Sequence, residues 1–297
     1  VALVTVAAVL VSAVSLGLTR ISQTGLGLES AAMFEQSERI GDSCSYDSDF
    51  AAVIARCTFG TSSERKILLI GDSQVPAMSD GVARSAKETA AQVSMIFSNS
   101  CPVHARPNEL REQCAEFQKS FSSIVELVKP DVVIVANAAD LYVSRGGFGK
   151  PDTRIRDRFG RFPTNYDEAL SNWTDGVDSV LRSSVFGGVP LLYLQMIPSA
   201  PESSVSLVRR HLATADFSLD SRFDRNAIVD SERSILQRNP RVLVLDPADS
   251  LCPSGRCPLF VNGQPIYADS FHLNSRGSVL VSAAIQDALI QILEKSN

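Results

Sequence analysis

The sequence is poor in histidine and lacks the motifs that usually hold a metal ion or a phosphate-bearing cofactor. Only three histidines occur among 297 residues. The six cysteines form no C-x-x-C pair, a spacing common to zinc sites and redox motifs. No glycine-rich phosphate loop follows a hydrophobic run. We therefore expect no metal site and no cofactor within this domain.

Long runs of basic residues are also missing. Lys and Arg total 28 against 33 Asp and Glu, which gives a net charge of -5 and a pI of about 5.3. Proteins that bind nucleic acid usually concentrate Lys and Arg in one patch. The composition therefore predicts no nucleic-acid partner, while an acidic surface is compatible with any soluble domain.

The first eighteen residues lack both charge and proline. They read VALVTVAAVLVSAVSLGL, and Arg20 closes the run. An apolar run of this length is typical of a membrane-spanning helix. A signal peptide fits less well, because there is no initiator Met and no basic leading segment. We expect residues 1–19 to be the last transmembrane helix of a longer protein; the alternative is a buried helix of a soluble protein.

Cysteine is present in an even number and at loop-like spacing. Such a pattern favours disulfides formed in an oxidising compartment, although six cysteines allow fifteen pairings. Reduced, buried cysteines of a cytosolic protein are the alternative, which the membrane run disfavours. The candidate partners are close in sequence: Cys44 with Cys57, Cys101 with Cys114, and Cys252 with Cys257.

Short apolar runs bounded by turn residues begin after residue 65. Runs of this kind fit strands that are buried on both faces. The segments between them carry apolar residues at spacings of three and four, which predicts helices. The expected strands are Lys66–Ile70, Gln92–Phe97, Asp131–Val135, Pro190–Ile197 and Arg241–Leu245, and the expected helices are Asp80–Ala90, Glu112–Val128, Tyr166–Val185, Asp224–Gln237 and Ser275–Lys295.

The alternation of strand and helix predicts the fold class and the domain limits. A parallel sheet with helices on both faces is the usual outcome. We expect a three-layer α/β/α domain with a flavodoxin-like, five-stranded parallel sheet over residues 65–297. Residues 20–64, rich in Ser, Gly and Asp, are expected to be a linker or small extension, and Arg145–Phe162 an exposed loop.

Polar residues follow the first and third predicted strands, where ligands bind in sheets of this kind. Ser73 stands at a strand-to-helix junction, so its hydroxyl and backbone N–H should face the crevice. Asn137 follows the third strand. A serine needs a base to become a useful nucleophile. Of the three histidines, only His272 sits at the start of the closing helix, at the edge of the sheet.

Asp269 precedes His272 by three residues, and this D-x-x-H spacing can place a carboxylate against one ring nitrogen while the other faces Ser73. Each residue also has a simpler explanation. Ser73, Asp72 and Asp269 could cap helices or turns, and His272 could be a surface histidine. The combination, rather than any single residue, indicates a Ser–His–Asp site.

These motifs resemble a known family. Ile70-Gly71-Asp72-Ser73 is similar to the first block of the SGNH (GDSL-like) hydrolase superfamily, and Asp269-Ser270-Phe271-His272-Leu273-Asn274 resembles its last block. The preceding membrane run, Cys101-Pro102 and the Cys252/Cys257 loop resemble, more narrowly, the SGNH domain fused to acyltransferase-3 membrane proteins, which O-acetylate cell-wall and surface polysaccharides. The resemblance covers residues 65–297.

The chain departs from the family pattern in three places. Gln74 stands where the family often has His, and Asp72 and Gln74 are both expected to line the substrate site. The second-block glycine is not evident; Ser98, Asn99 and Ser100 occupy its place. Asn137 lacks the usual G-x-N-D surroundings, and its alternative role is a strand cap. With these departures, the resemblance implies an oxyanion site formed by the Ser73 N–H and Asn137.

The resemblance implies an O-acyltransferase that passes an acyl group, most simply acetyl, through Ser73 to a hydroxyl of a cell-surface glycan or glycolipid. An upstream acyltransferase-3 membrane domain of the same chain would take the group from a donor such as acetyl-CoA. The domain would then lie on the extracytoplasmic side of the cell membrane. A carbohydrate esterase with the same triad and a non-catalytic glycan-binding domain are the alternatives.

Overall fold

The computed structural model describes residues 39–60, 62–103, 112–144, 153–186, 188–201, 216–219 and 225–295. The predicted membrane helix over residues 1–19 lies outside these segments. Within the described part of the chain, no helix is both long and apolar enough to cross a membrane.

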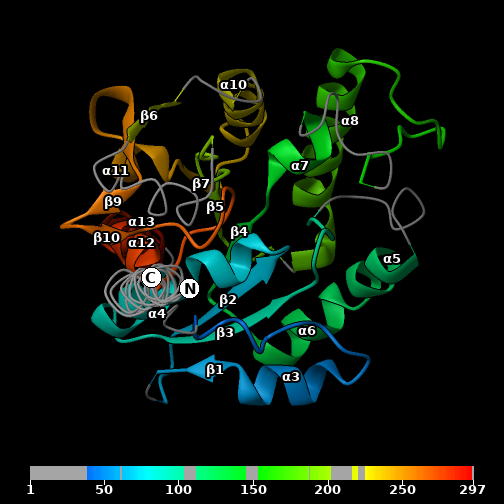
Figure 1. Ribbon diagram of the computed structural model, residues 1–297. Helices are drawn as coiled ribbons and strands as arrows, with labels where there is room; N and C mark the ends of the chain where they lie inside the picture. Colours follow the sequence, from blue (N-terminus) through cyan, green and yellow to red (C-terminus); the bar gives the residue numbers. More distant parts are fainter. Residues whose placement is uncertain are drawn as a thin grey trace, which may run out of the picture.

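A six-stranded sheet forms the centre of the domain, in the order β1-β3-β2-β4-β5-β7 (Figure 1). Five of these strands run parallel, which confirms the predicted parallel sheet. The sixth, β1, pairs antiparallel with β3 and comes from the segment expected to be a linker. The strands are β1 (Thr58–Phe59), β2 (Lys66–Gly71), β3 (Gln92–Phe97), β4 (Val132–Ala136), β5 (Leu191–Leu194) and β7 (Val242–Leu245).

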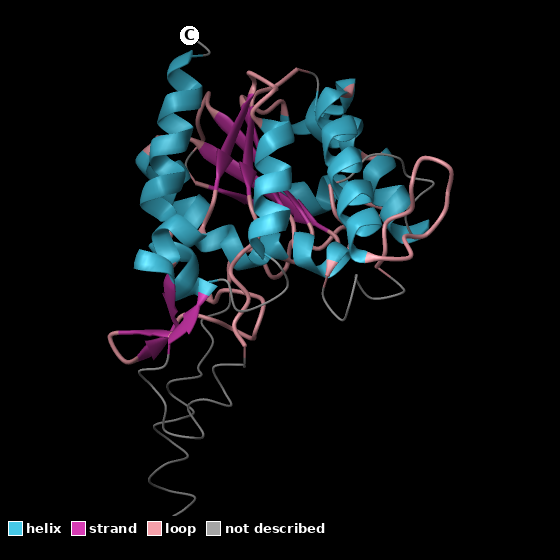
Figure 2. Cartoon of the chain, turned by 90° about the horizontal axis from the view of Figure 1, so that it is seen from above, coloured by secondary structure: helices cyan, strands magenta, loops and turns pink. Residues whose placement is uncertain are grey.

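Helices cover both faces of the sheet (Figures 1 and 2). One group packs together on one face, and the other group covers the opposite face. The first group contains α4 (Gln74–Glu88), α12 (Ser275–Leu280) and α13 (Ser282–Lys295). The second contains α3 (Phe50–Arg56), α6 (Phe121–Val128), α8 (Tyr166–Arg182) and α10 (Arg225–Leu236), with α5 (Glu112–Lys119) at its margin.

Two helices predicted as continuous are each broken once. The break between α5 and α6 falls at Ser120, and the break between α12 and α13 falls at Val281. At both points a serine hydroxyl donates to the carbonyl three residues earlier: Ser120 to Phe117 at 2.6 Å and Ser282 to Val279 at 2.7 Å. Such bonds compete with the helical ladder and bend helices, and apolar spacing does not reveal them.

Short elements connect the main helices and strands. Helix α7 (Ala139–Val143) follows β4, and the 3-10 turn η2 (Ser184–Phe186) precedes β5. After β7 come α11 (Ala248–Leu251) and the 3-10 turn η4 (Pro253–Gly255), and two small antiparallel pairs lie outside the main sheet. These pairs are β6 (Asp216–Ser218) with β8 (Arg256–Pro258), and β9 (Phe260–Val261) with β10 (Gln264–Pro265).

The extension before the sheet packs into the domain from residue 39 onward. Cys44 and Val53 are fully buried, and the backbone N–H of Tyr46 donates to the Phe97 carbonyl at the end of β3. The six cysteines form the three expected local disulfides: Cys44–Cys57, Cys101–Cys114 and Cys252–Cys257. The first of these fixes α3 against the extension, and the second closes the loop after β3.

Candidate active site

Ser73 lies between the end of β2 and the start of α4. A Cβ on the nearby Gly71 would meet the Ala136 carbonyl oxygen at 1.9 Å, so only glycine lets β2 pass this close to β4. Ser73 is the N-cap residue of α4, but its side chain makes no capping bond. Its Oγ lies 2.8 Å from His272 Nε2. The hydroxyl therefore faces the histidine and does not cap the helix.

The D-x-x-H turn is held by its own hydrogen bonds. Asp269 Oδ1 accepts from the backbone N–H of Phe271 at 2.7 Å and of His272 at 2.9 Å. Asp269 Oδ2 lies 2.7 Å from His272 Nδ1. Three side chains thus form a continuous hydrogen-bonded series, called here the Ser–His–Asp chain (Ser73, His272 and Asp269). This is the arrangement in which a carboxylate orients a histidine toward a serine nucleophile.

The Asp269 end of the Ser–His–Asp chain is open to water. The side chain of Asp269 is 51% exposed, and that of His272 is 20% exposed. Partial burial acts to raise the pKa of the Asp269 carboxyl. The hydrogen bond and charge of His272, with the backbone N–H groups of Phe271 and His272, outweigh this effect and lower the pKa below its usual value. Asp269 is therefore ionised at neutral pH.

Loop-to-loop bonds anchor the turn that carries His272. The hydroxyl of the buried Tyr267 donates to the Pro198 carbonyl at 3.0 Å, and the Ala200 N–H donates to the Ser270 carbonyl at 2.8 Å. The segment after β5 therefore supports the turn directly. Further contacts come from two more distant side chains.

Gln74 and Arg39 each bond a carbonyl beside His272. Gln74 Nε2 donates to the Phe271 carbonyl at 3.1 Å, and Arg39 Nη1 donates to the Leu273 carbonyl at 3.3 Å. Gln74 is buried, and its Oε1 has no hydrogen-bond partner in the described structure. Gln74, expected to line the substrate site, thus ties the start of α4 to the D-x-x-H turn. Sequence reasoning missed Arg39, because nothing in the pattern connects the extension to this turn.

Asp72 is fully buried beneath the nucleophile. Its Oδ2 accepts from the Tyr142 hydroxyl at 2.6 Å and the Ala138 N–H at 2.9 Å, and its Oδ1 accepts from the Gln74 N–H at 2.9 Å. Burial raises the pKa of this carboxyl, and the hydrogen bonds partly oppose that rise. The expected contact with substrate conflicts with this placement, because both oxygens are occupied and neither reaches solvent. The geometry is that of a brace between the Ser73 and Asn137 segments.

The hydrogen bond from Tyr142 to Asp72 could not be predicted from the sequence. It belongs to α7, which has only five residues, so apolar spacing gives no signal for this helix. The Tyr142 ring stacks on Trp173 of α8 with a centroid distance of 5.1 Å. This stacking fixes the hydroxyl against the Asp72 carboxylate.

Asn137 is buried at the end of β4, beside the nucleophile loop. Ala136 before it pairs with Gly71, and the Ala136 carbonyl accepts from the Asp72 N–H at 3.2 Å. Asn137 Oδ1 accepts from the Val103 N–H at 3.0 Å, which fixes the amide. Its Nδ2 makes no well-formed hydrogen bond within the described part of the chain, although it lies close enough to the Tyr193 hydroxyl to act on the pKa of that phenol.

The surroundings of this amide include a buried phenol. Burial, and then the Glu232 carboxylate, raise the pKa of the Tyr193 hydroxyl well above its usual value, while the Asn137 side chain opposes that rise in part. The Tyr193 hydroxyl donates to Glu232 Oε1 at 2.9 Å. Tyr193 therefore stays protonated, and its hydroxyl proton is used in the hydrogen bond to Glu232.

No group of three or more His, Cys, Asp or Glu side chains capable of holding a metal ion occurs in the segments that the structure describes. Two of the three histidines, His104 and His211, lie outside those segments. His272 is the histidine that the described structure places against a serine.

Comparison with known proteins identifies the family. The model of the SGNH domain that is fused to AT3 domains matches residues 43–287. The chain belongs to this family. No curated protein matches the sequence. The periplasmic domain of a lipopolysaccharide acetyltransferase from Salmonella ser. Paratyphi A shares the fold, with a TM-score of 0.61 at 16% identity over 90% of this chain and 97% of the other.

A second structure is more distant. A provisionally named platelet activating factor from Streptococcus pneumoniae aligns with a TM-score of 0.44 at 12% identity, over 94% of this chain and 99% of that one. The family match begins at residue 43, within the extension that packs on the sheet. The SGNH domain of this chain thus includes the segment with the Cys44–Cys57 disulfide.

The region of the second block in this SGNH domain is a tight turn. Ser98 is buried, and its N–H donates to the Gly71 carbonyl at 3.2 Å. Ser100 has a φ of +54°, a backbone conformation that glycine adopts more easily. The Cys101 N–H donates to the Ser98 carbonyl at 3.0 Å and closes the turn. The serine-rich segment therefore makes the turn without the family's glycine.

Proposed function

We propose that this SGNH domain transfers an acyl group, most simply acetyl, to a hydroxyl of a cell-surface glycan or glycolipid through an ester on Ser73. The observation that carries the proposal is the Ser–His–Asp chain, with both of its hydrogen bonds between 2.7 and 2.8 Å. The family description supports transfer, because these SGNH domains are fused to AT3 domains.

The first half of the reaction forms the acyl-serine. His272 Nε2 takes the proton of Ser73 Oγ as the oxygen attacks the acyl carbonyl of the donor. Asp269 holds the ring with its proton on Nδ1 and stabilises the imidazolium that forms. His272 then gives its proton to the leaving group as the bond to the donor breaks. The acyl group is left as an ester on Ser73.

The second half passes the acyl group to the acceptor. His272 removes the proton of an acceptor hydroxyl, whose oxygen attacks the ester carbonyl, and Ser73 Oγ leaves with the proton from His272. The Ser73 N–H and Asn137 Nδ2 are the candidate donors to the oxyanion in both halves. One such donor typically contributes on the order of 10²–10³ in rate.

The source of the acyl group and the location of the SGNH domain follow from the fusion of this family to AT3 domains. An AT3 membrane domain in the same chain would deliver the acyl group, from a donor such as acetyl-CoA. The SGNH domain would then work on the extracytoplasmic side of the membrane. The three disulfides support that side, because disulfides persist in oxidising compartments.

Hydrolysis is the second candidate, and one observation favours it. The half-exposed Asp269 and the partly exposed His272 leave the acid–base end open to water. Water in place of the acceptor hydroxyl would make the same site an esterase. The two activities differ only in which molecule attacks the ester on Ser73.

The test is mass spectrometry of the chain after incubation with 4-nitrophenyl acetate. We expect a single acetyl adduct and release of nitrophenol, both lost in Ser73→Ala, with a rate decrease of about 10⁴ or more. Ser234→Ala, an exposed serine on α10, is the matched control and should react like the wild type. A folded Ser73→Ala protein that still forms the adduct would contradict the proposal. Adding methanol then separates transfer, which yields methyl acetate, from hydrolysis, which yields acetate alone.

A further inference from the structure

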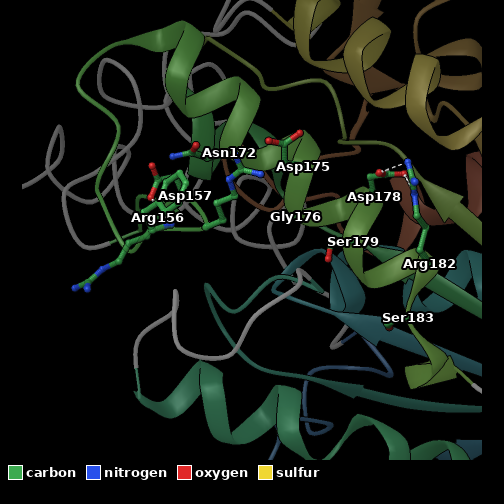
Figure 3. Close-up of a pocket in the computed structure, with 11 residues that line it drawn as sticks. Arg156, Asp157, Asn172, Asp175, Gly176, Asp178, Ser179, Arg182 and Ser183 are labelled. Carbon is green, nitrogen blue, oxygen red and sulfur yellow. Dashed lines mark hydrogen bonds and ion pairs between the residues drawn. The ribbon is translucent and has the colours of Figure 1, made fainter.

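One pocket is lined entirely by residues outside the Ser–His–Asp chain. It has a volume of about 850 Å³ and lies between α8 and the loop of residues 154–163 (Figure 3). Figure 3 shows Asn172 and Asp175 on the helix and Arg156 and Asp157 on the loop. This volume is in the range of pockets that hold small molecules or a segment of a polymer. None of its lining residues belongs to the Ser–His–Asp chain.

The loop is held in a defined shape. Asp157 Oδ1 accepts from the N–H of Phe159 at 2.8 Å and of Arg161 at 2.9 Å. Asn172 Nδ2 donates to the carbonyl of the buried Ile155 at 3.1 Å, which ties the loop to α8. The wall of the pocket is therefore built before any ligand arrives, which lowers the entropy that binding would cost.

Four arginines of the loop stack on two exposed phenylalanines. A guanidinium over a ring keeps its N–H groups free in its own plane. Arg161 is neutralised by Asp157 at 2.7 Å, but Arg156 and Arg158 have no carboxylate partner within the described part of the chain. Guanidinium carbons lie 4.4 to 5.4 Å from the ring centroids, with Arg154 and Arg156 over Phe162, and Arg158 and Arg161 over Phe159.

The opposite wall carries groups that bind hydroxyls. Asn172, Asp175 and Ser179 line it along α8, and they offer both donors and acceptors. A flat membrane surface could not enter the pocket, whereas a single polymer segment could lie between α8 and the loop. A polyhydroxylated chain with acidic groups matches both walls, because its hydroxyls face α8 and its anions face Arg156 and Arg158.

We propose that this pocket binds a segment of an acidic glycan, with its carboxylate or phosphate groups on Arg156 and Arg158. The inference deepens the proposed function and rests on it in one respect: the bound glycan is the acceptor whose hydroxyl takes the acyl group from Ser73. Binding by the pocket itself does not depend on the reaction. The two statements can therefore be tested apart.

The experiment measures binding of hexagalacturonic acid to the 297-residue chain by isothermal titration calorimetry at low salt. We expect binding that weakens at least about tenfold in Arg156→Gln/Arg158→Gln and that falls as salt is added. Arg84→Gln/Arg238→Gln, which removes the same charge from two exposed positions elsewhere, should bind within about twofold of the wild type. Both double variants should keep the unfolding temperature of the wild type.

Three outcomes would overturn the proposal: no binding of hexagalacturonic acid, equal weakening in the two double variants, or binding of the wild type to vesicles of phosphatidylglycerol in place of the sugar. The reaction with 4-nitrophenyl acetate serves as the separate readout for the proposed function. The rate of this reaction should be unchanged in Arg156→Gln/Arg158→Gln, because the small ester reacts at Ser73 and makes no contact with the pocket. Loss of binding with an intact Ser73 reaction is the expected pair of results.

Discussion

The two halves of the candidate active site are held by different means. The nucleophile side is part of the core: Gly71 and Asp72 are buried, and Asp72 accepts three hydrogen bonds. The acid–base side is a surface turn, where the Asp269 side chain is 51% exposed. The fold itself therefore fixes Ser73, whereas hydrogen bonds between loops fix His272.

This difference predicts how the two halves respond to mutation. A change beneath Ser73 should act on stability first and on activity as a consequence. A change in the turn should act on activity and leave stability almost intact, because few buried contacts are lost. Three substitutions and a pH series can separate these two responses.

The largest effect is expected from Asp269→Ala. Without the carboxylate, His272 loses the group that fixes its tautomer and its orientation toward Ser73. The rate of reaction with 4-nitrophenyl acetate should fall about 10³–10⁴-fold, as for the acid of other triads. Chemical unfolding should be nearly unchanged, because the side chain is half exposed. A loss of less than about tenfold would show that Asp269 does not orient His272.

Asp72→Ala should have the opposite profile. It leaves the Tyr142 hydroxyl and the Ala138 and Gln74 N–H groups buried without their acceptor. We expect the free energy of unfolding to fall by about 3–5 kcal/mol, measured by urea denaturation. Asp72→Asn keeps the shape and one acceptor oxygen, so its loss should be smaller. A loss below about 1 kcal/mol in Asp72→Ala would contradict the bracing role.

A smaller effect is expected from Gln74→Leu, which removes a contact between the nucleophile side and the acid–base side of the site. It removes the bond from Nε2 to the Phe271 carbonyl, and it also removes the buried Oε1 that has no partner in the described structure. The two changes offset each other in stability, which should stay within about 1 kcal/mol of the wild type. The rate should fall by about tenfold or less, because the D-x-x-H turn loses one support. An unchanged rate would mean that the remaining bonds hold the turn alone.

Much of the nucleophile side could be predicted from the sequence. A buried strand that ends in Gly-Asp-Ser sets the position of Ser73, since the strand pattern and the sheet topology together fix which edge it reaches. Asp269 and His272 were predictable because their spacing is local. Both bonds of the Ser–His–Asp chain follow once the last helix packs beside α4.

The supporting contacts could not be predicted in the same way. Arg39 and Leu273 are 234 residues apart in sequence, and Gln74 and Phe271 are 197 apart. Contacts this distant depend on tertiary packing and leave no periodic signal in a single sequence. The burial of Asp72 is a similar case, because an aspartate beside a serine looks the same whether it faces a substrate or a tyrosine.

The smallest predicted effect concerns pH, and its sign differs between the two halves. The pKa of Asp269 is lowered in the folded protein, so the unfolded chain binds more protons at acid pH. The contribution of Asp269 to stability is therefore present above about pH 3.9 and is lost as the pH falls through the folded pKa. The raised pKa of Asp72 means that the folded chain binds more protons. Its contribution therefore declines as the pH rises from about 3.9 through the folded pKa.

Urea unfolding between about pH 3 and pH 7 measures both signs. The stability difference between wild type and Asp269→Asn should grow with pH in the acid part of this range, by a small amount because water screens the exposed carboxylate. The difference between wild type and Asp72→Asn should shrink with pH in the upper part. Slopes of the same sign would mean that the two carboxylates share one environment, and that the contrast between a core nucleophile and a surface acid–base turn does not hold.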